Sequence, residues 1–200
     1  MTHLSDADNP SNEKTTRQIA LFEKITESLE GERSLANSAA VLNFPRSHAD
    51  WVRPGLMLYG VSPVVGKTAS DLGLKPVMTL RSKIMAIRNQ QKGDEIGYGS
   101  AFVCPTDMPV GMVAIGYGDG YPFHLSVQTP ILINSRECFV IGRVAMDMMA
   151  VDLRSYPEAK IGDEVILWGE GLPVERIAEA THSIPYELLC GIARRVQGAR

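Results

Sequence analysis

Met78-Thr79-Leu80-Arg81-Ser82-Lys83-Ile84-Met85-Ala86-Ile87, at residues 78–87, opens the larger part of the chain and decides its fold class. Leu80, Ile84 and Ala86 alternate in part with polar neighbours, a period of two that is typical of a strand with one buried face. Short apolar runs bounded by Gly, Pro, Asn or Asp follow at residues 110–115, 131–133, 138–141, 148–153 and 164–168. Such evenly spaced short strands predict an antiparallel barrel or sandwich, and helical patterns at residues 174–180 and 186–192 close the chain.

The chain before Pro76 has a different pattern, in which short strands and helices alternate. Strands are predicted at residues 2–4, 34–36 and 51–53, and helices at residues 12–30 and 39–44. In the longer helix, apolar residues recur at spacings of three and four, and Gly31 follows as a stop signal. This alternation is typical of parallel βα units, and three of them are too few to close a parallel barrel. Residues 1–75 are therefore expected to end a larger α/β domain.

Composition excludes several classes of function. The chain has 200 residues, of which 44% are hydrophobic and 22% charged, and its net charge of −3 gives no basic surface for nucleic acid. No apolar run is long enough to span a membrane, and the polar, acidic start predicts no signal peptide. Cys104, Cys138 and Cys190 are too widely spaced for a metal cluster or a disulfide framework. We expect a cytoplasmic protein with reduced thiols and no metal.

Three glycine-bounded segments are the candidates for a functional site: Gly97-Tyr98-Gly99, Gly116 to Tyr121, and Gly142 to Asp147. Glycine allows sharp bends and close approach of the backbone, so these loops are expected to converge on one small site. A tyrosine acts as a base only if its pKa falls from about 10, which nearby cations achieve. The alternative is that each ring packs locally with its hydroxyl in water. At Met146, the backbone N–H is the group expected to contact a ligand, because the side chain is typical of core packing.

Two strand-to-helix turns form a second candidate. Asn37 and Ser38 follow one predicted strand, and Arg53-Pro54-Gly55-Leu56 ends the next. These groups either cap the helices or offer N–H and hydroxyl donors to a phosphate, and the two readings stay open. Because the carboxyl ends of parallel strands lie at one edge of a sheet, both turns are expected at the same edge.

Taken together, these residues resemble the alanine racemase family, whose members use pyridoxal phosphate to interconvert L- and D-alanine. The resemblance runs from His3 to about Val196. It rests on the order of Thr2-His3, Ala36-Asn37-Ser38-Ala39-Ala40, Val52-Arg53-Pro54-Gly55 with Tyr59-Gly60, Gly97-Tyr98-Gly99, Ile115-Gly116-Tyr117-Gly118-Asp119-Gly120, Gly142-Arg143 with Met146-Asp147, Gly162-Asp163 and Pro185-Tyr186-Glu187.

The resemblance implies the fold and the cofactor site. The implied fold class is α/β plus all-β. Residues 1–75 would be the last part of a cofactor-binding (β/α)8 barrel, and residues 76–200 would be the β-rich C-terminal domain. The implied assembly is a head-to-tail homodimer. Ser38, with the backbone of Gly55 and Leu56, is implied to bind the cofactor phosphate, and Asn37 is counted among the cofactor-binding residues. Arg53 is implied to face the pyridine nitrogen, with His3 hydrogen-bonded behind it.

The resemblance also implies the catalytic roles. Tyr98 is the base that faces the α-proton of L-alanine, and it acts across the dimer interface on the partner's cofactor. Tyr117 lines the substrate entrance, and Met146 offers its backbone N–H to the substrate. The implied reaction passes through a pyridoxal phosphate aldimine by a two-base Tyr/Lys mechanism and supplies D-alanine for bacterial peptidoglycan.

The cofactor lysine of the family's pattern is missing. The cofactor lysine lies in a Lys-Ala-x-Ala-Tyr-Gly segment, and no such segment occurs in this chain. The chain is therefore expected to match only the C-terminal portion of the family and to be inactive alone. Two alternatives stay open: an incomplete chain that serves only dimerisation or assembly, and a racemase of a related amino acid such as serine.

Overall fold

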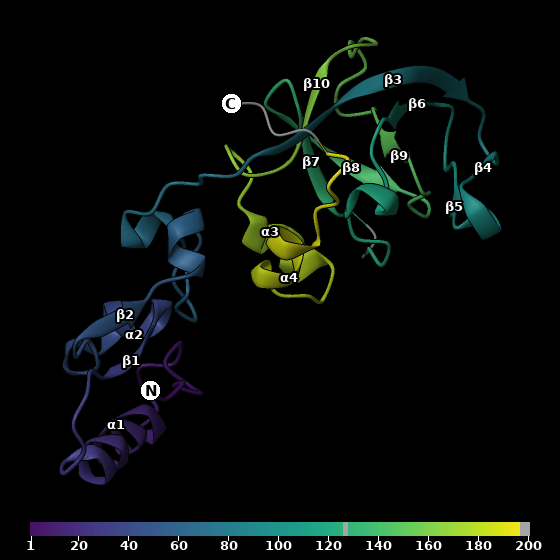
Figure 1. Cartoon of the computed structure of the whole chain (residues 1–200). Coiled ribbons are helices and arrows are strands. Elements are labelled where there is room, and N and C mark those ends of the chain that lie inside the picture. Colours follow the sequence, from purple (N-terminus) through teal and green to yellow (C-terminus); the bar gives the residue numbers. More distant parts are fainter. Residues whose placement is uncertain (126–127, 197–200) are drawn as a thin grey trace. The chain divides into compact units, whose positions relative to one another are not determined.

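The structure is a computed structural model that describes residues 1–125 and 128–196. The chain divides into two compact units, Met1–Val77 and Met78–Arg200. Each unit has its own elements, which Figure 1 labels, and each is described by itself.

The first unit is a small α/β arrangement. Strand β1 (Ser34–Asn37) pairs in parallel with β2 (Trp51–Arg53), with Asn37 opposite Arg53. Helix α1 (Lys14–Thr26) precedes β1, and helix α2 (Ser38–Asn43) follows it directly. Short 3₁₀ turns occupy Pro45–Ser47, Leu56–Tyr59 and Ser70–Leu72. One apolar cluster holds the unit together: Leu4, Ala7, Ile19, Leu35, Ala36, Ala39 and Ala40.

Local chemistry explains where α2 begins and ends. The Asn37 side chain accepts a hydrogen bond from the Ala40 N–H at 3.1 Å, so it caps the helix start. Pro45 follows the last turn and cannot continue it. The helix predicted at residues 12–30 is shorter in the structure, at Lys14–Thr26.

The strand predicted at residues 2–4 does not form. The Thr2 N–H donates to the Ser34 carbonyl at 3.1 Å, but no ladder continues from it among the described residues. Leu4 instead turns into the apolar cluster, where it is 2% exposed. Burial of this side chain therefore takes the place of strand pairing.

The second unit is built on a closed antiparallel barrel. Its strands are β3 (Leu80–Gln90), β6 (Met108–Val113), β7 (Pro130–Ile133), β8 (Arg136–Ile141), β9 (Met149–Asp152) and β10 (Glu164–Trp168). They close in the order β10-β3-β6-β9-β8-β7 (Figure 1). Outside the barrel, β4 (Glu95–Ile96) pairs with β5 (Phe102–Val103), and helices α3 (Val174–Ala180) and α4 (Pro185–Gly191) end the unit.

The alternation read from the sequence becomes the inside and outside of this barrel. Leu80 and Ile84 are buried, and between them Arg81 and Lys83 are exposed. Strand β3 pairs with β10 at its start and with β6 along the rest, and a register shift between Ile84 and Ala86 bends it. Closure through β10 and β7 leaves this sheet without a free edge. The barrel, and not the sandwich, is the correct one of the two predicted architectures.

Candidate functional site

The first candidate site lies at the carboxyl ends of β1 and β2, where Ser38 joins the two turns. Because these strands are parallel, their following turns lie at the same edge, as predicted. The Ser38 side chain is 2% exposed, and its Oγ accepts hydrogen bonds from the Gly55 N–H at 2.7 Å and the Met57 N–H at 3.4 Å. One buried hydroxyl therefore connects both turns.

The donors left over at this edge fit an anion. A serine hydroxyl has one donor and two acceptor positions, and here both acceptor positions are used. Among the residues that the structure describes, neither the Ser38 hydroxyl hydrogen nor the Leu56 N–H has an acceptor. A Cβ placed on Gly55 would stand 4.0 Å from Ser38 Oγ, so Gly55 lies directly beside the hydroxyl. These two donors suit the acceptor oxygens of an anion.

Arg53 lies at the end of β2 with its guanidinium held by the first unit. One terminal nitrogen donates to Ser34 Oγ, and the other donates to the carbonyls of Thr2 at 2.8 Å and Leu35 at 3.3 Å. These bonds fix the plane of the guanidinium, and they leave other N–H groups for a ligand.

His3 is not hydrogen-bonded behind Arg53, contrary to the expectation. Its side chain is exposed, and its carbonyl accepts a hydrogen bond from Gln18 Nε2 at 2.7 Å. Within the described part of the chain, backbone carbonyls and Ser34 take the position expected for the histidine ring. A role for His3 in binding a cofactor stays a prediction.

The second candidate site lies in the barrel unit, where the three glycine-bounded segments converge on residues 142–147. The Tyr117 N–H donates to the Ala145 carbonyl at 3.1 Å, and the Gly118 N–H donates to the Met146 carbonyl at 2.9 Å. A Cβ on Gly97 would stand 3.0 Å from the backbone nitrogen of Arg143. The segments that carry Tyr98 and Tyr117 therefore both contact residues 142–147.

Close approach explains the glycines at this junction. A Cβ on Gly116 would stand 2.2 Å from the Ala145 carbonyl oxygen, closer than real side chains come. At Gly118 it would meet an Arg195 nitrogen at 2.5 Å. Gly97 and Gly99 have φ of +80° and +67°, so Tyr98 stands on a bend that favours glycine on both sides.

The predicted functional side chains of this site face solvent. Tyr98 is 72% exposed, Tyr117 42% and Met146 54%. The Tyr117 ring contacts Phe123 edge to face at 5.6 Å between centroids. The Met146 N–H donates to no acceptor among residues 1–125 and 128–196, so it is available to a ligand.

Sequence reasoning missed Arg195 as part of this junction. Its Nε lies 2.8 Å from Asp119 Oδ1, and a terminal nitrogen lies 2.7 Å from Asp147 Oδ1 and 3.4 Å from the Met146 carbonyl. The hydrogen bond with Asp147 and the neighbouring carboxylate charges raise the pKa of Arg195 above its ordinary value. No local pattern could have found it, because its partners lie far away in the sequence.

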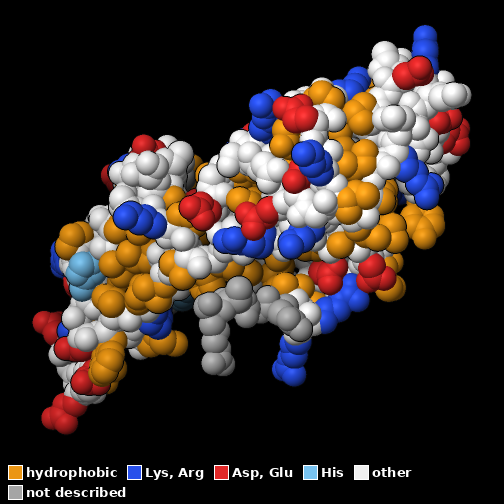
Figure 2. Space-filling model, turned by 90° about the horizontal axis from the view of Figure 1, so that it is seen from above, with side chains coloured by type: hydrophobic (Ala, Val, Ile, Leu, Met, Phe, Trp, Pro, Cys, Tyr) orange, Lys and Arg blue, Asp and Glu red, His pale blue; other side chains and the backbone are white. Residues whose placement is uncertain are grey.

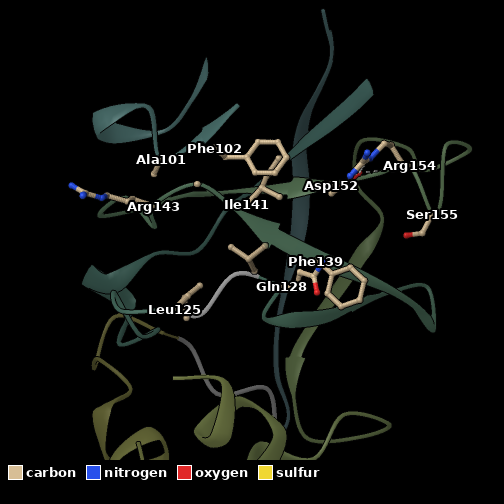
Figure 3. A pocket seen from close by; sticks show the side chains of 12 residues that line it. Ala101, Phe102, Leu125, Gln128, Phe139, Ile141, Arg143, Asp152, Arg154 and Ser155 are labelled. Atoms are coloured by element: carbon tan, nitrogen blue, oxygen red, sulfur yellow. Dashed lines mark hydrogen bonds and ion pairs between the residues drawn. The ribbon is translucent and has the colours of Figure 1, made fainter. Parts of the chain in front are cut away.

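A cavity of about 680 Å³ lies beside this junction and includes Gly142 and Arg143 in its lining. Figure 3 shows Arg143 at one end and the ion pair of Asp152 and Arg154 at the other. Apolar side chains such as Phe102 and Phe139 line the space between them. Tyr98, Tyr117 and Met146 are not part of this lining, so the predicted site is the group of loops next to the cavity.

The described residues also contain no group of three or more His, Cys, Asp or Glu side chains placed to hold a metal ion. None of the helices in the described ranges is both long and apolar enough to cross a membrane.

Comparison with known proteins supplies the family context of both sites. Residues 1–63 match the family model "Alanine racemase, N-terminal domain", and residues 77–199 match "Alanine racemase, C-terminal domain". An alanine racemase of Coxiella burnetii is 52% identical over 98% of this chain and 56% of its own length. The chain thus spans about half the length of the curated relatives it matches.

Solved structures agree with this match. The biosynthetic alanine racemase of Pseudomonas aeruginosa superposes with a TM-score of 0.93 at 43% identity, covering 97% of this chain and 54% of that one. The alanine racemase of Bartonella henselae, solved with covalently bound pyridoxal phosphate, gives 0.86 at 29% identity, covering 96% and 54%. The predicted fold class is confirmed: part of a (β/α)8 barrel followed by a β-rich domain.

Proposed function

The chain belongs to the alanine racemase family, and from this premise we propose that it forms the C-terminal part of a cytoplasmic enzyme that interconverts L- and D-alanine with pyridoxal phosphate. The single observation that carries the proposal is the Ser38 hydroxyl, buried at the shared edge of two parallel strands with its donor left over. The product D-alanine would serve peptidoglycan synthesis.

Ser38 and Leu56, with Asn37 and Gly55 beside them, would hold the cofactor phosphate. Within residues 1–125 and 128–196, the Ser38 hydroxyl and the Leu56 N–H are donors without an acceptor at one edge, which suits a group with several acceptor oxygens. Asn37 supports them indirectly, because its side chain caps α2 and so fixes the residue before Ser38. When bound, pyridoxal phosphate supplies an electron sink that acidifies the α-proton of an amino acid.

Arg53 would face the pyridine nitrogen of the cofactor. An arginine is a hydrogen-bond donor only and stays protonated in proteins, so it keeps a ring nitrogen that it contacts unprotonated. The three bonds of its guanidinium to Ser34, Thr2 and Leu35 hold it in place for this contact. An unprotonated ring is a weaker electron sink, which favours return of the proton over side reactions such as transamination.

Tyr98 would be the base that removes and returns the α-proton on the L-alanine side. Its exposure of 72% and the glycines on both sides suit a side chain that reaches into the site of a second subunit. Tyr117 would border the substrate entrance, and the Met146 N–H would hold the substrate. The assembly that this arrangement requires is a homodimer.

Racemisation also needs an acid/base group on the opposite face of the substrate, which the family supplies as the cofactor lysine. The lysines of this chain are all exposed, and none lies in β1 or β2 or in the turns that follow them. We therefore assign the lysine to a segment that this chain does not carry. This chain would provide the tyrosine side of the reaction.

The test uses two proteins: the 200-residue chain, and a fusion protein in which the part of the Coxiella burnetii relative that lies before the matched region precedes Met1. With pyridoxal phosphate and L-alanine, we expect D-alanine from the fusion protein and none from the chain alone. A folded fusion protein that takes up the cofactor but forms no D-alanine would contradict the proposal. Racemisation by the chain alone would contradict the assignment of the lysine.

A further inference from the structure

Arg195 is the side chain that ties the end of the chain to both substrate loops. It follows α4, and it contacts Asp119 in the loop of Tyr117 at 2.8 Å and Asp147 in the loop of Met146 at 2.7 Å. Arg195 also donates a hydrogen bond of 3.4 Å to the Met146 carbonyl. One planar guanidinium therefore spans two loops that are far apart in the sequence, which the fork geometry of arginine allows.

The contact reaches the backbone beneath Tyr117. Asp119 uses its second oxygen, Oδ2, to accept the Gly116 N–H at 2.9 Å, while Oδ1 faces Arg195. The Ala193 N–H donates to the Asp119 carbonyl at 2.9 Å, so the chain just before Arg195 is fixed to the same loop. On the other side, the Met146 carbonyl that faces Arg195 also accepts the Gly118 N–H. Arg195 thus stands at the point where the two loops meet.

We propose that Arg195 is a positioning residue that sets the distance between the Tyr117 ring and the Met146 N–H, and thereby the position in which the substrate binds. The inference rests on the proposed function, since it gives a task to the two residues assigned to the substrate. Removing the guanidinium releases the Asp119 and Asp147 carboxylates from each other and leaves the backbone hydrogen bonds from Tyr117 to Ala145 and from Gly118 to Met146 between the two loops. The substrate is then bound less well, although the reacting groups are unchanged.

A purely structural arginine would act differently, and the chain offers a matched control. Arg176 pairs with Glu137 at 2.7 Å, and its side chain is 47% exposed, compared with 48% for Arg195. The Arg176 pair joins α3 to β8 and touches neither substrate loop. Exposed ion pairs of this kind contribute little to stability, so neither R195Q nor R176Q should unfold the barrel.

The first experiment is hydrogen exchange by mass spectrometry on the fusion protein without cofactor or substrate, followed in peptides that cover residues 115–121. In R195Q, the Tyr117 and Gly118 amides should exchange roughly five- to tenfold faster than in the wild type. R195K keeps the charge but not the fork and should fall between the two. R176Q should leave these peptides unchanged. Equal exchange in R195Q and the wild type would overturn the inference, and so would equal acceleration by R176Q.

The second experiment measures racemisation kinetics in the fusion protein. Because the Met146 N–H holds the substrate before and during the reaction, R195Q should raise KM for L-alanine about tenfold and change kcat less. A fall in kcat with KM unchanged would overturn the inference. If the wild-type fusion protein forms no D-alanine, the proposed function fails, and the exchange result still decides the role of Arg195 in the loops.

Discussion

The structure separates two kinds of site residue at the scale of single side chains. Ser38 is buried and joins two turns, whereas Tyr98 stands almost free of the protein. A buried hydroxyl contributes to both stability and binding, while an exposed phenol contributes mainly to chemistry. These two residues therefore predict different outcomes for conservative substitutions.

We predict that Ser38→Ala weakens both folding and cofactor binding. The Gly55 N–H loses its acceptor, which costs about 1–3 kcal/mol where the group is shielded from water, and the donor to the phosphate disappears as well. The measurements are a denaturation curve of the fusion protein without cofactor and its titration with pyridoxal phosphate.

Ser47→Ala is the matched control for this prediction. Ser47 is also buried in the first unit, and its hydroxyl donates to the Phe44 carbonyl at 2.7 Å, away from the two turns. It should lose stability without a change in cofactor affinity. If Ser38→Ala bound pyridoxal phosphate as tightly as Ser47→Ala, the phosphate role of Ser38 would be wrong.

The sequence predicted some of these residues and missed others for physical reasons. Glycines that flank tyrosines indicate sharp bends locally, so the convergence of three loops could be inferred before the structure. The Arg195 contacts could not, since a hydrogen-bonded network between distant residues leaves no periodic signal. The resemblance places His3 behind Arg53, and in the structure Ser34 and two backbone carbonyls accept the hydrogen bonds of this guanidinium, an arrangement that no local pattern predicts.

At the scale of elements, β3 illustrates what periodicity can and cannot decide. Its alternation predicted a strand, which forms and extends to Gln90. The same alternation fits a barrel or a sandwich, because both bury one face of each strand. The pairing of β10 with β7 closes the barrel, and this contact between distant residues cannot be predicted from a short stretch of sequence.

The turn before β10 supports a prediction about pH. Asp163 Oδ2 accepts the Lys160 N–H at 2.8 Å, and this bond, followed by one from Asn134, holds the pKa of Asp163 below its ordinary value. A lowered carboxyl pKa stabilises the fold above the unfolded pKa of about 4, and the contribution is lost as the pH falls through the folded value.

Asp163→Asn should therefore destabilise the barrel unit at neutral pH, and the difference from wild type should shrink as the pH falls below about 4. Chemical denaturation followed by Trp168, which is fully buried in β10, measures both proteins across this range. A difference that stays constant from neutral to acidic pH would contradict this role of the turn.

At the scale of the molecule, the first unit leaves apolar side chains uncovered. Trp51 and Val52 of β2 are 59% and 41% exposed, and Leu21 and Ile25 of α1 are 58% and 62% exposed. Figure 2 shows hydrophobic side chains gathered in patches between charged ones on the face that it displays. A parallel pair of strands normally continues into a larger sheet that covers such residues.

We predict that the chain alone self-associates or is poorly soluble, because association buries these apolar side chains and pairs the strand edge. The fusion protein should instead give a single dimeric species, since its added segment completes the sheet. Light scattering of both proteins at several concentrations makes the comparison. A stable, monodisperse monomer of the chain alone would show that the first unit covers its own apolar surface.

In the proposed enzyme, Tyr98 of this chain provides the base for one face of the substrate. The most direct measurement is exchange of the alanine α-proton in deuterium oxide, with pyridoxal phosphate and the fusion protein carrying Tyr98→Phe. The wild type should exchange and interconvert both enantiomers. In the variant, exchange of L-alanine should fall by about 10²- to 10⁴-fold, while D-alanine still exchanges without becoming L-alanine. Exchange of L-alanine at the wild-type rate in the variant would show that Tyr98 is not the base.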